Sequence, residues 1–191
     1  MADAGRVIAG TARSIRLDAP GPGTRPLSDR VKQTLFAILE PDIPGSRFLD
    51  LFAGSGAGGI EALSRGAAHA TFVEHDAGAI RVIRSNLERT ALAGDDRADI
   101  IRTDVLGWLH DTGRDDRGAY DLALLDPPYD DTEVLALALR EVGPLLSPGA
   151  RVVAKHFWRT PPPAAVGLLA SDRERRFGDT ALTFYRRAED A

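Results

Sequence analysis

The tetrapeptide Asp126-Pro127-Pro128-Tyr129 combines residue types that suit chemistry on a planar amine. An exocyclic amine of a nucleobase is a poor nucleophile, because its lone pair is delocalised into the ring. The Asp126 carboxylate and the Pro127 carbonyl can accept hydrogen bonds from such an NH₂ group, and two prolines stiffen the turn that carries these acceptors. Tyr129 offers a ring on which an unpaired or flipped base can stack. The motif predicts metal-free methyl transfer to nitrogen; the alternative is a rigid turn with a capping aspartate.

A second motif lies at the glycine-rich stretch that follows the apolar run Phe48–Phe52. The run and the glycines together are typical of a buried strand, a tight turn and the start of a helix. Glycines allow the backbone to turn sharply and allow a ligand to approach the main chain closely. This turn is therefore a candidate ligand-binding loop.

Four acidic residues close four successive predicted strands: Asp50, Glu74, Asp104 and Asp126. In an open parallel sheet, ligands bind at the carboxyl ends of the strands. We therefore expect these side chains to converge on one crevice. Any of them could instead cap a helix, and for Asp104 taken alone this interpretation is equally good.

The glycine turn is also compatible with a dinucleotide site. Gly54-x-Gly56-x-x-Gly59 fits the nicotinamide fingerprint, and Glu74 follows at about the expected twenty residues. However, Asp50 would repel a pyrophosphate, and no Lys or Arg occurs between Phe48 and Leu63. Carboxylates at this place favour a cationic nucleoside without phosphates, with its ribose on Glu74 and its base amine near Asp104. S-adenosyl-L-methionine is such a ligand, and a nicotinamide-dependent dehydrogenase is the competing hypothesis.

Alternating strands and helices must position these residues. The pattern predicts strands at 48–52, 70–74, 99–103, 121–125 and 150–154, helices at 60–63, 79–92, 105–109 and 133–142, and a terminal hairpin at 173–177 and 180–186. This alternation predicts an α/β fold with a parallel sheet covered on both faces. The first forty residues predict strands at 6–10 and 14–17 and a helix, capped by Ser28 or Asp29, that ends before Pro41. We therefore expect a basic N-terminal extension, residues 1–40, and a main domain, residues 41–191.

Composition limits the class of protein. The chain has 191 residues, 43% of them hydrophobic, and no cysteine, which excludes disulfides and thiolate metal sites. We see neither a signal peptide nor a membrane-spanning run and expect a cytoplasmic protein. The formal net charge is −4, but residues 1–34 and 151–191 each carry +3, whereas residues 35–150 carry −10. Basic segments attract phosphate backbones, but on charge alone ordinary solvated surface is an equally good interpretation. Next to a site that methylates a base, the candidate RNA-binding residues are Arg6, Arg13, Arg16, Arg25, Arg30, Lys32, Lys155 and Arg159.

These motifs resemble those of the class I S-adenosylmethionine-dependent N-methyltransferases. The chain is most similar to the RsmD-type 16S rRNA guanine-N2 methyltransferases, through Arg6–Gly10, Arg25–Val31, Leu49–Gly56, Glu61–Ala67, Leu125–Tyr129 and Gly178–Thr180. Gly58 departs from the pattern, where a larger apolar residue is expected. The resemblance implies a Rossmann-like, mostly parallel seven-stranded sheet with a terminal antiparallel hairpin and a small N-terminal extension. It implies a base site at Asp126, Pro127, Pro128 and Tyr129, and cofactor contacts from Asp50, Phe52, Ala53, Gly54, Gly56, Glu74, His75, Asp104 and Val105.

The resulting hypothesis is methylation of guanine N2 in 16S rRNA, of the guanine 966 type by family resemblance. The expected substrate is 16S rRNA or a 30S assembly intermediate, and we expect a monomer that needs neither a membrane nor a metal. Two alternatives stay open. The acceptor could be another planar amine, such as adenine N6 in DNA or RNA or a protein glutamine. The chain could also be a non-catalytic RNA-binding assembly factor.

Overall fold

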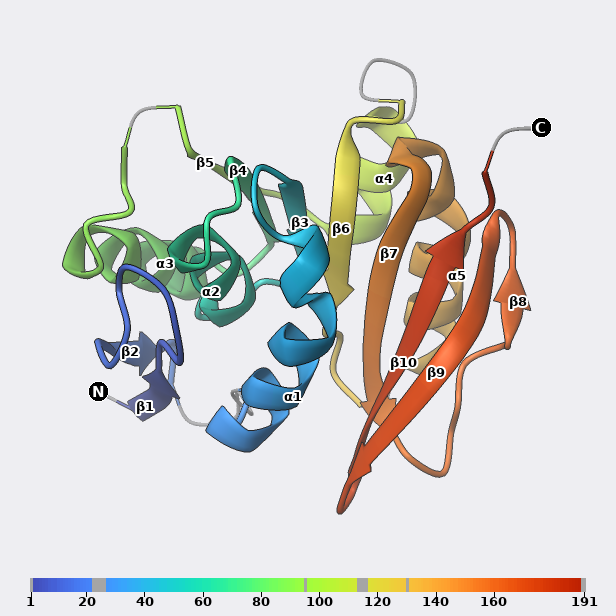
Figure 1. Cartoon of the computed structure of the whole chain (residues 1–191), viewed down its shortest axis with the longest axis horizontal. Coiled ribbons are helices and arrows are strands. Elements are labelled where there is room, and N and C mark those ends of the chain that lie inside the picture. The colour runs from blue at the N-terminus through green and yellow to red at the C-terminus, as the bar shows by residue number, and fades with distance from the viewer. Residues whose placement is uncertain (1, 22–26, 95, 113–116, 130, 190–191) are drawn as a thin grey trace. The chain divides into compact units, whose positions relative to one another are not determined.

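The computed structural model describes residues 2–21, 27–94, 96–112, 117–129 and 131–189 (Figure 1). The chain forms two compact units, Met1–Thr103 and Asp104–Ala191, and each is described by itself. Within the described residues, no helix combines the length and the apolar character needed to cross a membrane.

The first unit is built on three parallel strands in the order β5-β4-β3. These are β3 (Arg47–Leu51), β4 (His69–Glu74) and β5 (Ala98–Arg102). Helix α2 (Ala57–Ser64) connects β3 to β4, and helix α3 (Ala77–Arg89) connects β4 to β5, as parallel pairing requires (Figure 1). These βαβ connections confirm the predicted parallel arrangement of strands and helices.

Helix α1 (Asp29–Leu39) begins as predicted, because the Ser28 hydroxyl accepts a hydrogen bond from the Val31 amide. Its buried side chains include Val31, Leu35 and Leu39. A short 3₁₀ turn, η1 (Glu40–Asp42), contains Pro41 and ends the helix.

The N-terminal hairpin exists, but its strands differ from the predicted 6–10 and 14–17. They are β1 (Ala2–Arg6) and β2 (Arg16–Ala19), paired antiparallel with a register shift between Asp3 and Arg6. The predicted first strand fails because its backbone donors bind a helix instead. The amides of Ile8 and Ala9 donate to the Glu61 carboxylate at 2.7 and 3.0 Å. Residues 8 and 9 are thereby attached to α2.

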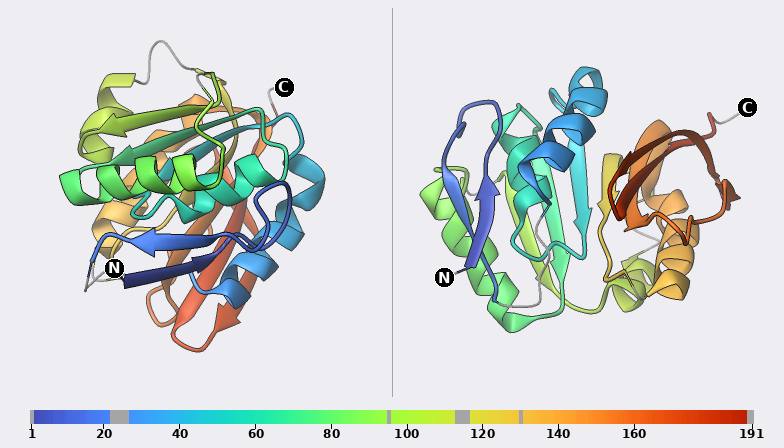
Figure 2. Two further views of the ribbon diagram at one scale, coloured as in Figure 1. Left: turned by 90° about the vertical axis from the view of Figure 1, so that its left-hand side faces the viewer. Right: turned by 90° about the horizontal axis from the view of Figure 1, so that it is seen from below.

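The hairpin also packs against α3, as the left view of Figure 2 shows. The Asn86 side chain donates to the Asp18 carbonyl at 3.0 Å and accepts from the Asp18 amide at 2.9 Å. Arg89 forms an ion pair with the Asp18 carboxylate at 2.5 Å. The N-terminal residues are therefore an integral layer of the first unit.

The second unit contains a mixed sheet. Strands β6 (Tyr120–Leu125) and β7 (Leu146–Phe157) pair in parallel, and the order β7-β10-β9-β8 continues with antiparallel pairs. The terminal hairpin consists of β9 (Leu169–Phe177) and β10 (Thr180–Arg187), as predicted, and the two-residue strand β8 (Ala165–Val166) is an addition to the prediction. Helices α4 (Val105–Thr112) and α5 (Thr132–Val142) and the 3₁₀ turn η2 (Gly143–Leu145) complete the unit. The expected α/β class, with parallel strands and a terminal antiparallel hairpin, is confirmed.

Candidate active site

The glycine turn after β3 has a left-handed backbone at several positions. The φ angles are 61° at Phe52, 54° at Gly54 and 76° at Gly56, and the Gly56 amide donates to the Ala53 carbonyl at 2.7 Å. Gly59 is needed for a different reason, because a Cβ atom there would lie 2.3 Å from the Phe72 ring. The first two glycines of the apparent fingerprint thus shape the turn, and the third allows α2 to pack on β4.

Two of the predicted acids hold this turn. The buried Asp50 accepts a hydrogen bond from the Gly59 amide at 2.7 Å through Oδ2. Glu74, also buried, accepts from the Gly54 amide through Oε2 and from the Asp76 amide through Oε1, both at 2.9 Å. Adjacent parallel strands therefore bring both carboxylates to the same loop.

The residue after Glu74 points to solvent. The His75 side chain is 79% exposed, and its Nδ1 atom lies 3.2 Å from Glu74 Oε1. Ala53 is held close to β4, since its amide donates to the Val73 carbonyl at 3.2 Å. The predicted cofactor contacts up to residue 75 thus lie in two segments of the first unit, residues 50–56 and 74–75, which the hydrogen bond from Gly54 to Glu74 joins.

Asp104 and Val105 belong to the second unit. Asp104 is exposed and its Oδ2 accepts from the Gly107 amide at 2.8 Å, so it caps α4, while Val105 is buried. This is the helix-capping role that the sequence left open for Asp104. The convergence of all four acids on one crevice stays a prediction.

Asp126, at the end of β6, has a cationic partner that the sequence did not reveal. Lys155 Nζ lies 2.5 Å from Asp126 Oδ1, and the two side chains are 7% and 16% exposed. The β6–β7 register, which pairs Leu125 with Ala154, places the following residues side by side. Burial raises the pKa of the Asp126 carboxyl, and the Lys155 ammonium acts in the opposite direction. This is a partly desolvated carboxylate held by a single charged hydrogen bond.

Tyr129 is fixed by the terminal hairpin. Its hydroxyl lies 2.5 Å from the Thr180 hydroxyl, and Lys155 Nζ lies 5.1 Å from the centre of its ring. The Phe157 ring centroid is 6.5 Å away. Sequence reasoning missed the roles of Thr180 and Lys155; the only available signal was the Gly178–Thr180 segment, which was part of the resemblance but carried no role.

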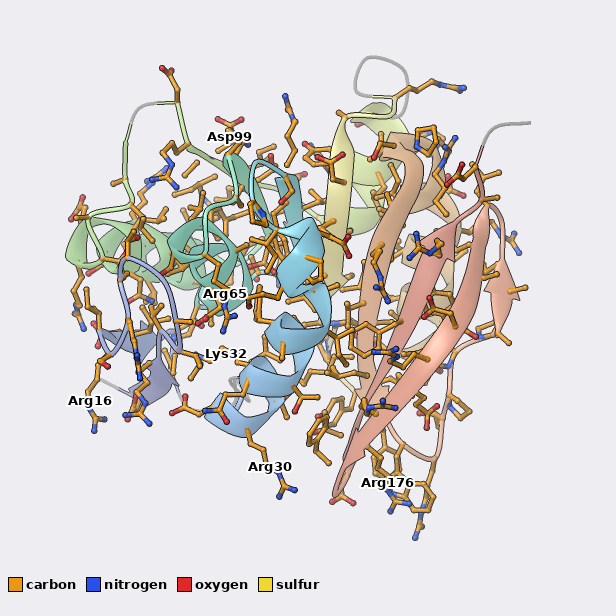
Figure 3. All side chains as sticks on the ribbon, viewed as in Figure 1. Arg16, Arg30, Lys32, Arg65, Asp99 and Arg176 are labelled. Carbon is orange, nitrogen blue, oxygen red and sulfur yellow. The ribbon has the colours of Figure 1, made fainter. Side chains whose placement is uncertain are left out.

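The basic residues expected to contact RNA fall into different environments, several of them visible in Figure 3. Arg13, Arg30 and Arg159 are exposed, while Arg6 and Arg16 are exposed and form ion pairs with Asp29 (3.2 Å) and Asp3 (2.7 Å). Arg25 lies outside the described residues.

Lys32 was expected to contact RNA at the surface, and this expectation is wrong. It is fully buried and donates to the Arg6 carbonyl at 2.6 Å. Burial lowers its pKa, while the carboxylates of Glu61 and Asp29 act in the opposite direction. Lys32 fixes α1 against the N-terminal segment and is not accessible to RNA.

Comparisons with known proteins show the family of this chain. The family model described as "Conserved hypothetical protein 95" matches residues 5–186. The chain belongs to this family. It is 38% identical over 184 residues to the Bacillus subtilis protein named "Putative rRNA methyltransferase YlbH", which covers 95% of this chain and 98% of that protein.

The chain is also similar to proteins from Escherichia coli. The chain is 40% identical over 125 residues to the Escherichia coli "Ribosomal RNA small subunit methyltransferase D", covering 65% of this chain and 60% of that protein. The solved structure entitled "Putative methyltransferase yhhF from Escherichia coli" matches with a TM-score of 0.80 and 30% identity, over 97% of this chain and 98% of that one. The resemblance to the RsmD-type methyltransferases and the Rossmann-like methyltransferase fold are confirmed.

S-adenosyl-L-methionine is the cofactor expected of a member of this family, and the glycine turn suits it. The turn has little side-chain bulk, and it is bordered by two buried carboxylates whose charge favours a cationic ligand. The same two carboxylates would repel a pyrophosphate. The donor set therefore fits a sulfonium nucleoside better than a dinucleotide.

Proposed function

We propose that this protein methylates the exocyclic N2 of a guanine in small-subunit rRNA, using S-adenosyl-L-methionine. One observation carries the proposal: the partly buried Asp126 carboxylate, paired with Lys155, lies in a proline-stiffened turn beside the ring of Tyr129. The names of the relatives from Bacillus subtilis and Escherichia coli support rRNA as the substrate class.

In the proposed reaction, Asp126 and the Pro127 carbonyl accept hydrogen bonds from the guanine NH₂ group. This orients the nitrogen lone pair toward the methyl donor and favours a pyramidal nitrogen. When bound, the cofactor supplies a methyl group whose bond to sulfur breaks with the electron pair remaining on sulfur. As the new N–C bond forms, the amine gains positive charge and releases one proton, for which Asp126 is the nearest proposed acceptor.

Lys155 takes a new role in this proposal. Instead of binding an RNA phosphate, its ammonium binds Oδ1 of Asp126 and opposes the rise in the carboxyl's pKa that burial causes. Tyr129 provides the stacking surface for the target base, and its hydroxyl bond to Thr180 sets the direction of the ring.

For the cofactor we propose the contacts that the resemblance implied: Asp50, Phe52, Ala53, Gly54, Gly56, Glu74, His75, Asp104 and Val105. Glu74 is the proposed partner of the ribose hydroxyls, since a carboxylate oxygen that accepts one amide can accept a second donor. Asp104 uses Oδ2 to cap α4, so its proposed bond to the adenine amine would use Oδ1.

The proposed RNA surface comprises Arg6, Arg13, Arg16, Arg25, Arg30 and Arg159. We further propose that the protein acts in the cytoplasm as a monomer on 16S rRNA or a 30S assembly intermediate, and that residues 1–40 are an extension of the domain formed by residues 41–191.

The test is in vitro transfer of labelled methyl groups to free 16S rRNA, isolated 30S subunits, DNA and a protein fraction. Mass spectrometry of the digested nucleosides should reveal N2-methylguanosine at one position of the rRNA. Label in N6-methyladenine or in methylated glutamine would show that the acceptor is adenine N6 or a protein glutamine instead of guanine N2. Absence of both transfer and cofactor binding would favour the RNA-binding assembly factor, and binding of NADH would favour the dehydrogenase.

A further inference from the structure

Trp158 forms an unusual cluster with two arginines at the end of β7. The centre of its ring lies 3.4 Å from the guanidinium carbon of Arg176 and 5.0 Å from that of Arg159. Both arginines are exposed, and the indole is partly exposed. The Arg176 guanidinium, labelled in Figure 3, also donates through Nε to the Gly178 carbonyl at 2.9 Å. A planar cation is thus held against an aromatic ring at the surface of the second unit.

This cluster is continuous with the proposed base site. The ring centroids of Trp158 and Phe157 are 6.3 Å apart, and those of Phe157 and Tyr129 are 6.5 Å apart. The hairpin turn supports both ends of this row, because the Asp179 carbonyl accepts from the Trp158 amide at 3.1 Å and Thr180 holds the Tyr129 hydroxyl. Phe157 therefore lies between the ring of Tyr129 and the indole of Trp158 in a continuous series of ring contacts.

Strand β9 carries three exposed arginines, Arg173, Arg175 and Arg176, together with the exposed Glu174. Because side chains alternate along a strand, Arg173 and Arg175 lie on the opposite face from Arg176. Proteins that bind unpaired RNA stack its bases on aromatic rings and on guanidinium planes, and hold its phosphates with arginine. If the cluster only stabilised the fold, one arginine would be enough to cover the indole. Here two exposed guanidinium groups lie near one partly exposed ring.

We propose that Trp158, Arg159 and Arg176 bind an unpaired nucleotide next to the target guanine. The base of this neighbour extends the stack formed by the Trp158 ring and the Arg176 guanidinium, and Arg159 binds its phosphate. The inference rests on the proposed function, because it takes the acceptor to be RNA. It assigns to these three residues the positioning of the RNA strand beside the base that enters the turn at Asp126.

The direct test is tryptophan fluorescence. Trp108 is buried in α4, so the Trp108→Phe variant leaves Trp158 as the only tryptophan. A short single-stranded RNA containing the target sequence should quench its emission, whereas S-adenosylhomocysteine alone should not. Unchanged emission at saturating RNA would overturn the proposal, even if methylation proceeds.

Kinetics give an independent test. Trp158→Ala should raise the RNA concentration needed for half-maximal activity by about tenfold, as expected for loss of one stacked base. Trp158→Phe should restore most of the loss, and Arg176→Ala with Arg159→Ala should give a comparable defect. Arg84→Ala, on the exposed face of α3, is the matched control.

The outcomes separate the two hypotheses. RNA affinity within twofold of wild type in Trp158→Ala, together with normal rRNA methylation, would refute the nucleotide site and leave the proposed function intact. Methylation of a substrate other than RNA would refute the proposed function instead. Calorimetric affinity for S-adenosylhomocysteine and far-UV circular dichroism should match wild type in every variant, which identifies any folding defect.

Discussion

Lys155 Nζ lies 2.5 Å from Asp126 Oδ1, and the side chains of both residues are largely shielded from solvent. A carboxylate buried without a partner would favour its neutral form, in which it is a poor acceptor. The ammonium counters that tendency and fixes the direction of the carboxylate. The ion pair therefore influences whether the Asp126 carboxyl is ionised, which the proposed reaction requires.

Replacing Lys155 by Met should shift the pH dependence of turnover. Without the ammonium, burial raises the pKa of Asp126 unopposed. The carboxyl must be ionised to accept the amine, so the acidic limb of the kcat profile should move to higher pH. The measurement is kcat against pH for both proteins at saturating cofactor; an acidic limb in the same place would show that Asp126 does not titrate in the reaction.

Asp126→Ala should separate catalysis from cofactor binding. Turnover should fall by at least about a hundredfold, the lower range for losing a positioned acid–base group. The affinity for S-adenosylhomocysteine, measured by calorimetry, should stay close to that of wild type. Equal losses in both would mean that the residue holds the cofactor rather than the amine.

Thr180→Val should mimic Tyr129→Phe. Each change removes one hydroxyl of the 2.5 Å contact, so each should raise KM for RNA with a smaller effect on cofactor affinity. Because the two residues share one interaction, the double variant should be no worse than the poorer single variant. Fully additive losses would show that the hydroxyls act separately.

The folding stability of the first unit should depend strongly on Glu61. This buried carboxylate accepts from the amides of Ile8 and Ala9 and from Arg65. Glu61→Ala should lower the free energy of unfolding by about 3 kcal/mol, since it leaves two partly buried amide donors and one partner of an ion pair without their acceptor. Urea denaturation gives this value, and Glu88→Ala on the exposed face of α3 should change it by less than about 0.5 kcal/mol.

Arg13 and Arg16 test the proposed RNA surface in the N-terminal hairpin. Alanine at both positions should weaken RNA binding and reduce the slope of log K against log salt by about one for each lost phosphate contact. Since Arg16 also pairs with Asp3, the variant Asp3→Asn serves as a control for the loss of that pair. An unchanged slope would show that neither arginine contacts an RNA phosphate.

The sequence predicted most regular elements, because apolar periodicity and strand-end signals are local. It placed the N-terminal strands wrongly, because partners on α2 take the backbone donors of Ile8 and Ala9. It counted Lys32 as a surface cation, because nothing local shows that the Arg6 carbonyl draws the ammonium inward. The Lys155–Asp126 and Thr180–Tyr129 contacts are equally non-local, since strand register creates both.

The attachment of residues 8 and 9 to Glu61 has a consequence for any shortened version of this protein. A chain that starts at residue 41 would lose both backbone amides that donate to the Glu61 carboxylate, while the ion pair of Glu61 with Arg65 would stay. Loss of these two hydrogen bonds would weaken the support of α2, which follows the glycine turn. The N-terminal segment thus helps to hold α2 in place and, through α2, the glycine turn for which we propose cofactor binding.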